Sequence, residues 1–388
     1  MTVKAGVDIL LENPEKHLRG SRVGLVTNPT GATGDLTPTL DALYSHPCVE
    51  LKAVFGPEHG ARGDVQDALP VGHSIDPSTG LPVYSLYGEF MKPTAEMLEG
   101  VDALVLDIQD VGARFYTYTS TLTYSLQAAA EHGVSLIVLD RPNPVNGLAV
   151  EGNILEPEFK SFVGLHPIPM RHGLTMGELA RFVNQEIGTD LTVVPMRGWR
   201  RGMWFDETGL PWVQPSPNIP TLDTATVYPG ACLFEGVNVS EGRGTTHPFE
   251  CLGAPWIDGE RWAAELNGLG LGGVRFRACS FTPTFSKYDG QRCVGVQLHV
   301  LDRGSFKPVE TALHMLAAVL RLWPEEFRWL EPSYDRRRHF DLLAGTSKTR
   351  EALGRGTPVQ EIVDGWREKL EEFDEMRQDF LIYRPGGG

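Results

Sequence analysis

A glutamate stands on a hinged loop in the segment FGPEHGARGD, directly after an apolar run. Pro57 fixes the backbone before Glu58, and Gly56 and Gly60 permit turns that are closed to other residues. Such a loop can hold a carboxylate at a fixed point, which favours a catalytic acid. The alternative is a structural turn in which Glu58 caps a helix or pairs with Arg62.

Two more carboxylates, Asp107 and Asp110, occur in DIQDVGARFYTYT, with Arg114 and Tyr116 close behind. Paired carboxylates suit general acid and base chemistry, because like charges and burial push the pKa values of the two groups apart. The same set could bind a divalent metal ion. A structural role, in which Asp107 accepts hydrogen bonds from a neighbouring loop, explains the same residues equally well.

A third candidate is SEGRGTTHPFE, in which Gly242 and Gly244 bare the backbone amides around Arg243. This pattern suits a carboxylate, a phosphate or an N-acetyl group, and a structural loop between domains is the alternative. The sequence contains no GxxxxGK[ST], GxSxG or HExxH pattern, and no GxGxxG follows a predicted strand. It therefore offers no motif for a phosphate loop, an α/β-hydrolase elbow, a zinc protease or a dinucleotide site.

Polar segments rich in glycine or proline follow four apolar runs, which are typical of strands buried on both faces. The runs alternate with helical patterns, which indicates parallel β-α-β units. Ligands bind at the carboxyl edge of such sheets, so we expect the candidate residues to meet there. The predicted strands are residues 22–28, 50–56, 101–108 and 134–140, and the predicted helices are 36–45, 118–132 and 176–187, the last with a capping box at Thr175.

The second half of the chain has a different pattern. Apolar and polar residues alternate in GVRFRACSF and CVGVQLHVL, as in antiparallel strands with one covered face. Helices are expected at about 308–323 and 358–373. We therefore predict an α/β fold, with a Rossmann-like parallel sheet domain over residues 1–200 and a second, smaller mixed α+β lobe over 201–388.

The 388 residues carry a net charge of −15, which argues against nucleic acid as a partner because phosphate binding needs a basic face. Five widely spaced cysteines without a CxxC pair indicate neither a zinc ribbon nor a disulfide framework. No stretch approaches the ~18 apolar residues of a membrane span, and the first residues show no signal-peptide pattern. We expect a cytoplasmic protein without membrane insertion, with a processed exported form as the alternative.

The chain resembles the exo-β-N-acetylmuramidase family (NamZ-type) from about Gly6 to Tyr383. The resemblance implies a glycosidase of cell-wall recycling, which removes terminal β-linked N-acetylmuramic acid from the non-reducing ends of peptidoglycan fragments. It further implies an active site in a cleft between two lobes. Many members carry a signal peptide, and this sequence departs from them there. The motifs that carry the resemblance are GLVTNPTG, FGPEHGARGD, VYSLYG, DIQDVGARFYTY, DRPNP, SPNIPTLDTATVYPG, EGVNVSEGRGTTHPFE, GAPWI, FSKYDG and FDLLAGT.

The resemblance assigns the catalytic carboxylate to Glu58, the glutamate of the GPEHG motif. A glycosidase also needs a group that activates water or stabilises the positive charge at the sugar, and we expect Asp110, Asp107 or Glu241, in that order. The sequence decides neither retention nor inversion, and it leaves participation of the N-acetyl group open.

Substrate binding is the second role that the resemblance implies. Arg243 or Arg62 would bind the lactyl carboxylate of muramic acid, which explains a cationic group in an acidic protein. No cofactor or metal ion is expected. Further substrate contacts are expected from His59, Arg114, Tyr116, Arg141, Asn218 and Glu241.

Two rival functions stay open at this point. A metal-dependent phosphoesterase would use the cluster of Asp107, Asp110, Glu58 and His59, and excess chelator would abolish its activity. A non-catalytic binder of cell-wall sugars would bind its ligand without turnover.

Overall fold

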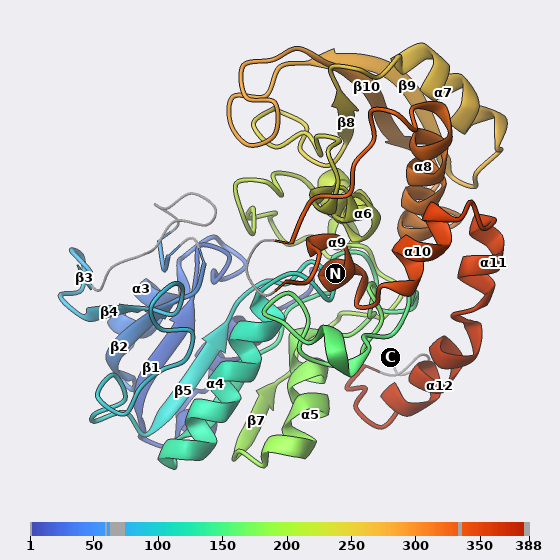
Figure 1. The fold of residues 1–388 in the computed structure, drawn as a ribbon. Coiled ribbons are helices and arrows are strands. Elements are labelled where there is room, and N and C mark those ends of the chain that lie inside the picture. Colours follow the sequence, from blue (N-terminus) through green and yellow to red (C-terminus); the bar gives the residue numbers. More distant parts are fainter. Residues whose placement is uncertain (1, 59, 63–73, 333–335, 384–388) are drawn as a thin grey trace.

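The computed structural model describes residues 2–58, 60–62, 74–332 and 336–383, and this part of the chain contains two β-sheets. The larger has the strand order β3-β4-β2-β1-β5-β6-β7 and the smaller has the order β8-β10-β9. Figure 1 shows the sheets at opposite ends of the molecule, with α6 and α9 between them. The strands are β1 (Arg22–Thr27), β2 (Glu50–Gly56), β3 (Ser74–Ile75), β4 (Pro82–Ser85), β5 (Ala103–Asp107), β6 (Ser135–Leu139), β7 (Leu191–Val194), β8 (Cys251–Ala254), β9 (Val274–Phe281) and β10 (Cys293–Val300).

Helices cover both faces of the larger sheet. Successive residues of β5 point to opposite faces, so Leu104 belongs to the apolar cluster that contains Leu122 of α4, whereas Val105 belongs to the cluster that contains Leu43 of α3. No helix in the described residues is long and apolar enough to cross a membrane. The helices are α1 (Gly6–Glu12), α2 (Pro14–Leu18), α3 (Thr39–Ser45), α4 (Tyr118–His132), α5 (Met176–Ile187), α6 (Leu222–Ala231), α7 (Gly259–Gly268), α8 (Pro308–Leu322), α9 (His339–Ala344), α10 (Lys348–Gly354), α11 (Val359–Asp364) and α12 (Arg367–Arg377), with 3₁₀ turns at η1 (Pro157–Phe159), η2 (Phe205–Glu207) and η3 (Cys232–Gly236).

The parallel core predicted for the first half is confirmed. β2, β1, β5 and β6 are neighbours in that order and run parallel. α4 and α5 have the predicted bounds, and Thr175 forms the predicted capping box with Glu178. α3 begins at Thr39, three residues later than predicted, because Pro38 occupies its N-cap with an extended backbone and disfavours helix in the residue before it.

The second half also follows its predicted pattern, with one correction. β9 and β10 pair antiparallel as expected, and β8 adds a third strand that the alternation did not reveal. The single helix predicted over 358–373 is wrong, because the chain forms α11 and α12 there. Gly365 ends α11, and glycine favours a helix interior less than any residue except proline.

The carboxyl-terminal segment returns to the first lobe, and Figure 1 shows α12 at the foot of the molecule near α5. The Tyr383 hydroxyl donates a hydrogen bond to Asp140 (2.7 Å), and the Phe380 ring packs edge-on against Phe182 at 5.4 Å between centroids. The second half therefore contacts the first through both the centre of the molecule and this terminal segment. The predicted boundary near residue 200 stays a prediction.

Candidate functional site

Glu58 lines a cavity of about 540 Å³ whose walls come from both halves of the chain. The loop after β2 and the start of α4 form one wall, and residues from α6 to α9 form the other. This cavity is therefore a candidate for the active site that the resemblance implies between two lobes. The residues on which the following description depends are Glu58, Phe115, Tyr116, Thr117, Tyr118, Asn218, Tyr228, Glu235, Arg243, Phe249, Arg337 and His339.

The loop that carries Glu58 is built as its glycines predict. A side chain at Gly56 would place a Cβ atom 2.6 Å from the Ala61 amide nitrogen, so only glycine fits the close approach. Gly60 has a φ of 76°, and its amide donates a hydrogen bond of 2.9 Å to the Pro57 carbonyl. His59 lies outside the described residues. The loop thus fixes the backbone that presents Glu58.

Thr117 connects Glu58 to α4. Its hydroxyl donates a hydrogen bond of 2.8 Å to Oε2 of Glu58, and Thr117 itself is the N-cap residue of α4. Because α4 packs against β5 and β6, this hydrogen bond anchors the Glu58 carboxylate to a helix that is itself held on the sheet. The same carboxylate lines the cavity.

A second carboxylate, Glu235, lines the same cavity and is ion-paired. Nη2 of Arg243 lies 2.8 Å from its Oε1, and Nε2 of His339 lies 3.3 Å from its Oε2. Burial alone would raise the pKa of Glu235, but Arg243 and His339 outweigh burial and hold that pKa well below its ordinary value. Glu235 therefore keeps its negative charge, although it is enclosed by protein.

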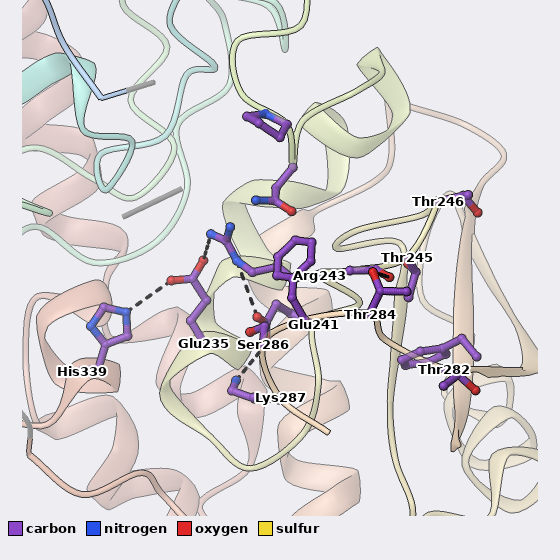
Figure 2. A pocket seen from close by; sticks show the side chains of 15 residues that line it. Glu235, Glu241, Arg243, Thr245, Thr246, Thr282, Thr284, Ser286, Lys287 and His339 are labelled. Atoms are coloured by element: carbon purple, nitrogen blue, oxygen red, sulfur yellow. Dashed lines mark hydrogen bonds and ion pairs between the residues drawn. The ribbon is translucent and has the colours of Figure 1, made fainter. Parts of the chain in front are cut away.

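Figure 2 shows how this ion pair continues into a chain of charges. Arg243 also approaches Glu241, with 3.5 Å between Nε and Oε1, and Lys287 lies 2.8 Å from the other oxygen of Glu241. These residues line a second cavity of about 970 Å³. Asn218, Glu235, Arg243 and His339 line both cavities, so the two adjoin along this wall.

Aromatic rings form much of the first cavity. Tyr116 lies edge-on to Tyr118 and Tyr228, with ring centroids 5.0 and 5.7 Å apart. Burial, with the neighbouring tyrosine and the charges of Asp110 and Glu58, raises the pKa of Tyr116 well above its ordinary value. Its hydroxyl therefore stays protonated. Apolar ring faces beside a few polar groups suit a ligand with both apolar C–H faces and hydroxyls, such as a sugar.

Asp107 and Arg141 form an ion pair with each other in the interior. Asp107 is fully buried at the end of β5, and Arg141 donates to both its oxygens, at 2.5 and 2.8 Å. The Thr39 hydroxyl donates to the same carboxylate at 2.5 Å. Neither residue of the pair lines the cavities that contain Glu58 or Glu241. These contacts favour the structural alternative for Asp107.

Asp110 also lies in the interior, outside both cavities. Its Oδ2 accepts a hydrogen bond of 2.6 Å from the Gly112 amide and lies 3.4 Å from Nε2 of His172. Because the Leu174 amide donates to Nδ1 of His172, the imidazole carries its proton on Nε2, facing Asp110. These contacts help to hold the loop that follows β5.

Two arginines of the predicted set are likewise held elsewhere. Arg62 forms ion pairs with Asp76 at 2.6 Å and with Asp41 at 2.9 Å. Arg114 is buried and donates to four backbone carbonyls, two of them at Leu343 and Ala344. Neither arginine lines the two cavities. Of the predicted residues, the structure thus brings Glu58, Tyr116, Asn218 and Arg243 to the first cavity and Glu241 to the second.

Among the residues of the first cavity that sequence reasoning missed are Glu235, His339 and Arg337. Glu235 opens the segment EGVNVSEGRGTTHPFE, so a signal was present beside Arg243. Arg337 lies within a run of three arginines and His339 directly follows it, and such a run looks like an ordinary solvated surface. Across the described ranges, no three His, Cys, Asp or Glu side chains are grouped so as to hold a metal ion. Asp107, one member of the cluster proposed for a phosphoesterase, is instead ion-paired with Arg141.

Comparisons with known proteins cover nearly the whole chain. Residues 23–223 match a family model described as exo-beta-N-acetylmuramidase NamZ, N-terminal, and residues 226–383 match its C-terminal counterpart. The peptidoglycan beta-N-acetylmuramidase NamZ of Bacillus subtilis (strain 168) is 51% identical over 383 residues, which are 98% of this chain and 91% of that protein.

Solved structures agree with this similarity. A crystal structure of a DUF1343 family protein from Bacteroides fragilis NCTC 9343 has a TM-score of 0.91 and 40% identity, with 99% of both chains covered. A second DUF1343 family protein from the same organism has a TM-score of 0.78 and 31% identity over the full length of both chains. The two-lobed fold is therefore shared by crystal structures of related sequence.

Proposed function

The chain belongs to the exo-β-N-acetylmuramidase NamZ family, and from this premise we propose that the Glu58 cavity is its active site. The protein is a glycoside hydrolase that acts on a peptidoglycan-derived sugar, as its Bacillus subtilis relative is named to do. In our proposal the cavity encloses a terminal N-acetylmuramic acid. The observation that carries this assignment is that Glu58 and the ionised Glu235 line the same cavity.

Glu58 is the proposed acid. It would give its proton to the glycosidic oxygen as the bond between that oxygen and the anomeric carbon breaks. Water then supplies the hydroxyl of the released N-acetylmuramic acid, and its second proton restores the acid over the complete cycle. The hydrogen bond from Thr117 fixes one carboxylate oxygen, which supports a defined direction for the transfer.

Glu235 is the proposed second carboxylate, in preference to Asp110, Asp107 and Glu241. Asp107 and Asp110 lie outside the cavity, and Glu241 is held between Arg243 and Lys287 in the neighbouring one. A fixed negative charge stabilises the positive charge that develops at the anomeric carbon. His339 lies beside this carboxylate, with Nε2 3.3 Å from Oε2 of Glu235, and lines the same cavity.

The lactyl carboxylate of muramic acid needs a cationic partner in the same cavity. Arg243 lines it but already bridges Glu235 and Glu241, whereas Arg62 lies elsewhere. Arg337 also lines the cavity, and its Nη1 donates to the carbonyls of Glu158 at 2.8 Å and Lys160 at 3.0 Å. We assign the lactyl carboxylate to Arg337, with Arg243 as a supporting charge.

The test is release of 4-nitrophenol from its β-N-acetylmuramide, with the β-N-acetylglucosaminide as the specificity control. Wild type should cleave the muramide, and Glu58→Gln should lose at least about a hundredfold in kcat. Glu99→Gln, the same change at an exposed position, should behave as wild type. Folded wild-type protein that cleaves neither compound would overturn the proposed function, and loss of activity in excess chelator would favour the phosphoesterase. The compartment in which the enzyme meets its substrate stays a prediction.

A further inference from the structure

The second cavity has no role in the function proposed above. It measures about 970 Å³ and shares with the first cavity the wall that contains Glu235, Arg243 and His339. An enzyme that encloses a terminal sugar must let the remainder of the saccharide leave the enclosed site. The shared wall is where the two spaces meet, so the second cavity is placed to receive that remainder.

The charged groups of the second cavity compensate one another. Glu241 lies between Arg243 and Lys287, and Arg243 also meets Glu235. Figure 2 shows these charges joined by contacts along one side, with the labelled threonines grouped on the other. A ligand on the threonine side therefore meets hydroxyl groups rather than an uncompensated charge. The labelled threonines are Thr245, Thr246, Thr282 and Thr284.

Two of these hydroxyls have a fixed direction. Thr245 donates its proton to the Gly242 carbonyl at 2.6 Å, and Thr284 donates to the Gly244 carbonyl at 3.0 Å. The Thr245 oxygen already accepts from the His247 amide at 3.1 Å, which leaves one of its two lone pairs to accept from a ligand, and the Thr284 oxygen can also accept. Acceptors suit the O–H and acetamido N–H donors of an N-acetylated sugar, and they do not suit a phosphate or a carboxylate.

Phe285 adds an apolar surface to the same cavity, where it is 39% exposed. Its loop is held in place, because the Thr284 amide donates to the Gly244 carbonyl at 3.0 Å. On the other side, Ser286 adopts a left-handed φ of 71°, which is costly for a residue other than glycine. The backbone is thus constrained on both sides of an exposed aromatic ring.

We propose that the second cavity binds the leaving-group saccharide, an N-acetylglucosamine-containing strand, and that Phe285 stacks against the apolar face of one of its rings. This inference rests on the proposed function of the Glu58 cavity. An aromatic platform beside hydrogen-bond acceptors matches a sugar ring, which has apolar C–H faces and donors around its edge. The site would favour saccharide strands over short synthetic leaving groups.

The test compares Phe285→Ala with wild type on three substrates of increasing leaving-group length. These are 4-nitrophenyl β-N-acetylmuramide, the disaccharide of N-acetylmuramic acid and N-acetylglucosamine, and the corresponding tetrasaccharide without peptide. The loss in kcat/KM should grow with length and reach roughly tenfold for the longest substrate. Phe285→Tyr, which keeps the ring, should restore most of the loss. Tyr44→Ala removes an exposed ring from α3 and should change none of the three rates.

The outcomes separate this inference from the function on which it rests. If folded wild type cleaves no muramide, the proposed function fails first. If wild type cleaves all three substrates but Phe285→Ala affects them equally or not at all, the saccharide site is overturned. A tetrasaccharide that carries stem peptides is measured alongside. If Phe285→Ala lowers the rate on this substrate alone, the saccharide site is also overturned, because the cavity would then bind peptide. Unchanged thermal unfolding of Phe285→Ala confirms that the comparison concerns folded protein.

Discussion

Nε2 of His339 lies 3.3 Å from Oε2 of Glu235, although the two residues are 104 positions apart in the chain. Arg243 holds the other oxygen of the same carboxylate at 2.8 Å. The three side chains belong to the wall that the two cavities share, and they place an ionised carboxylate in the cavity that Glu58 lines. The proposed role of Glu235 depends on this wall.

Glu235→Gln should lower kcat on the chromogenic muramide by about a hundredfold to a thousandfold, with a smaller change in KM, because the lost charge acts mainly on the transition state. Steady-state kinetics measure both constants. Glu331→Gln is the matched control, since Glu331 is 81% exposed and pairs with Arg338 at the surface. A rise in KM at unchanged kcat would contradict the role of Glu235 and indicate substrate binding alone.

Arg337→Met should raise KM for the muramide about tenfold to a hundredfold and change kcat less, because it removes a charge-assisted bond to the lactyl carboxylate. Arg337→Lys should recover part of the loss. Arg336→Met tests the neighbouring, exposed arginine, which does not line the cavity, and should behave as wild type. Equal losses in the Arg336 and Arg337 variants would show an effect on the loop rather than on recognition.

Asp107→Asn should destabilise the fold by about 3–5 kcal/mol, because it leaves the buried guanidinium of Arg141 without its ion-pair partner. Asp102 offers a close control, since it pairs with Arg22 just before the same strand and both side chains are 45% exposed. Asp102→Asn should therefore lower the unfolding free energy far less than Asp107→Asn does, because water screens an exposed ion pair. Denaturant unfolding measures both values. Loss of activity in folded Asp107→Asn protein at unchanged stability would return Asp107 to the catalytic candidates.

Asp140 predicts a pH dependence of stability. Burial, with the nearby charge of Glu178, raises the pKa of Asp140 to about 7 in the folded protein. The fold therefore favours the protonated acid, and this contribution is lost as the pH rises from the ordinary pKa of the acid through 7. Asp140→Asn cannot ionise, so its unfolding free energy should fall less than that of wild type in this interval, by on the order of a few kcal/mol.

Other groups also contribute to the pH dependence of the unfolding free energy. The effect of Asp140 is therefore the difference between the curves of wild type and Asp140→Asn. Burial also raises the pKa of Glu151 to about 7, in the same direction, and burial lowers the pKa of His166 to about 4, which costs stability on acidification. Both groups persist in Asp140→Asn. Parallel unfolding curves for wild type and variant from about pH 5 to about pH 7.5 would show that Asp140 stays ionised in the folded protein.

Local patterns in the sequence determined much of the first lobe. β2 and α5 have their predicted bounds, and the glycines beside Glu58 adopt the turn that their positions suggested. The motif order also indicated the family, which the comparisons confirm. These features depend on residues within a few positions of one another, such as the capping box of Thr175 and Glu178.

The tertiary structure alone decided which charged residues share a cavity. Asp107 and Arg141 looked available in the sequence, yet folding pairs them with each other in the interior. Glu235 and His339 come from distant segments, and only the packing of α9 against the 3₁₀ turn η3 brings them together. Asp107 and Glu235 are both ion-paired, but only Glu235 lines the Glu58 cavity. Three-dimensional packing, rather than neighbours in the chain, decides whether a paired carboxylate faces a cavity or is sealed in the interior.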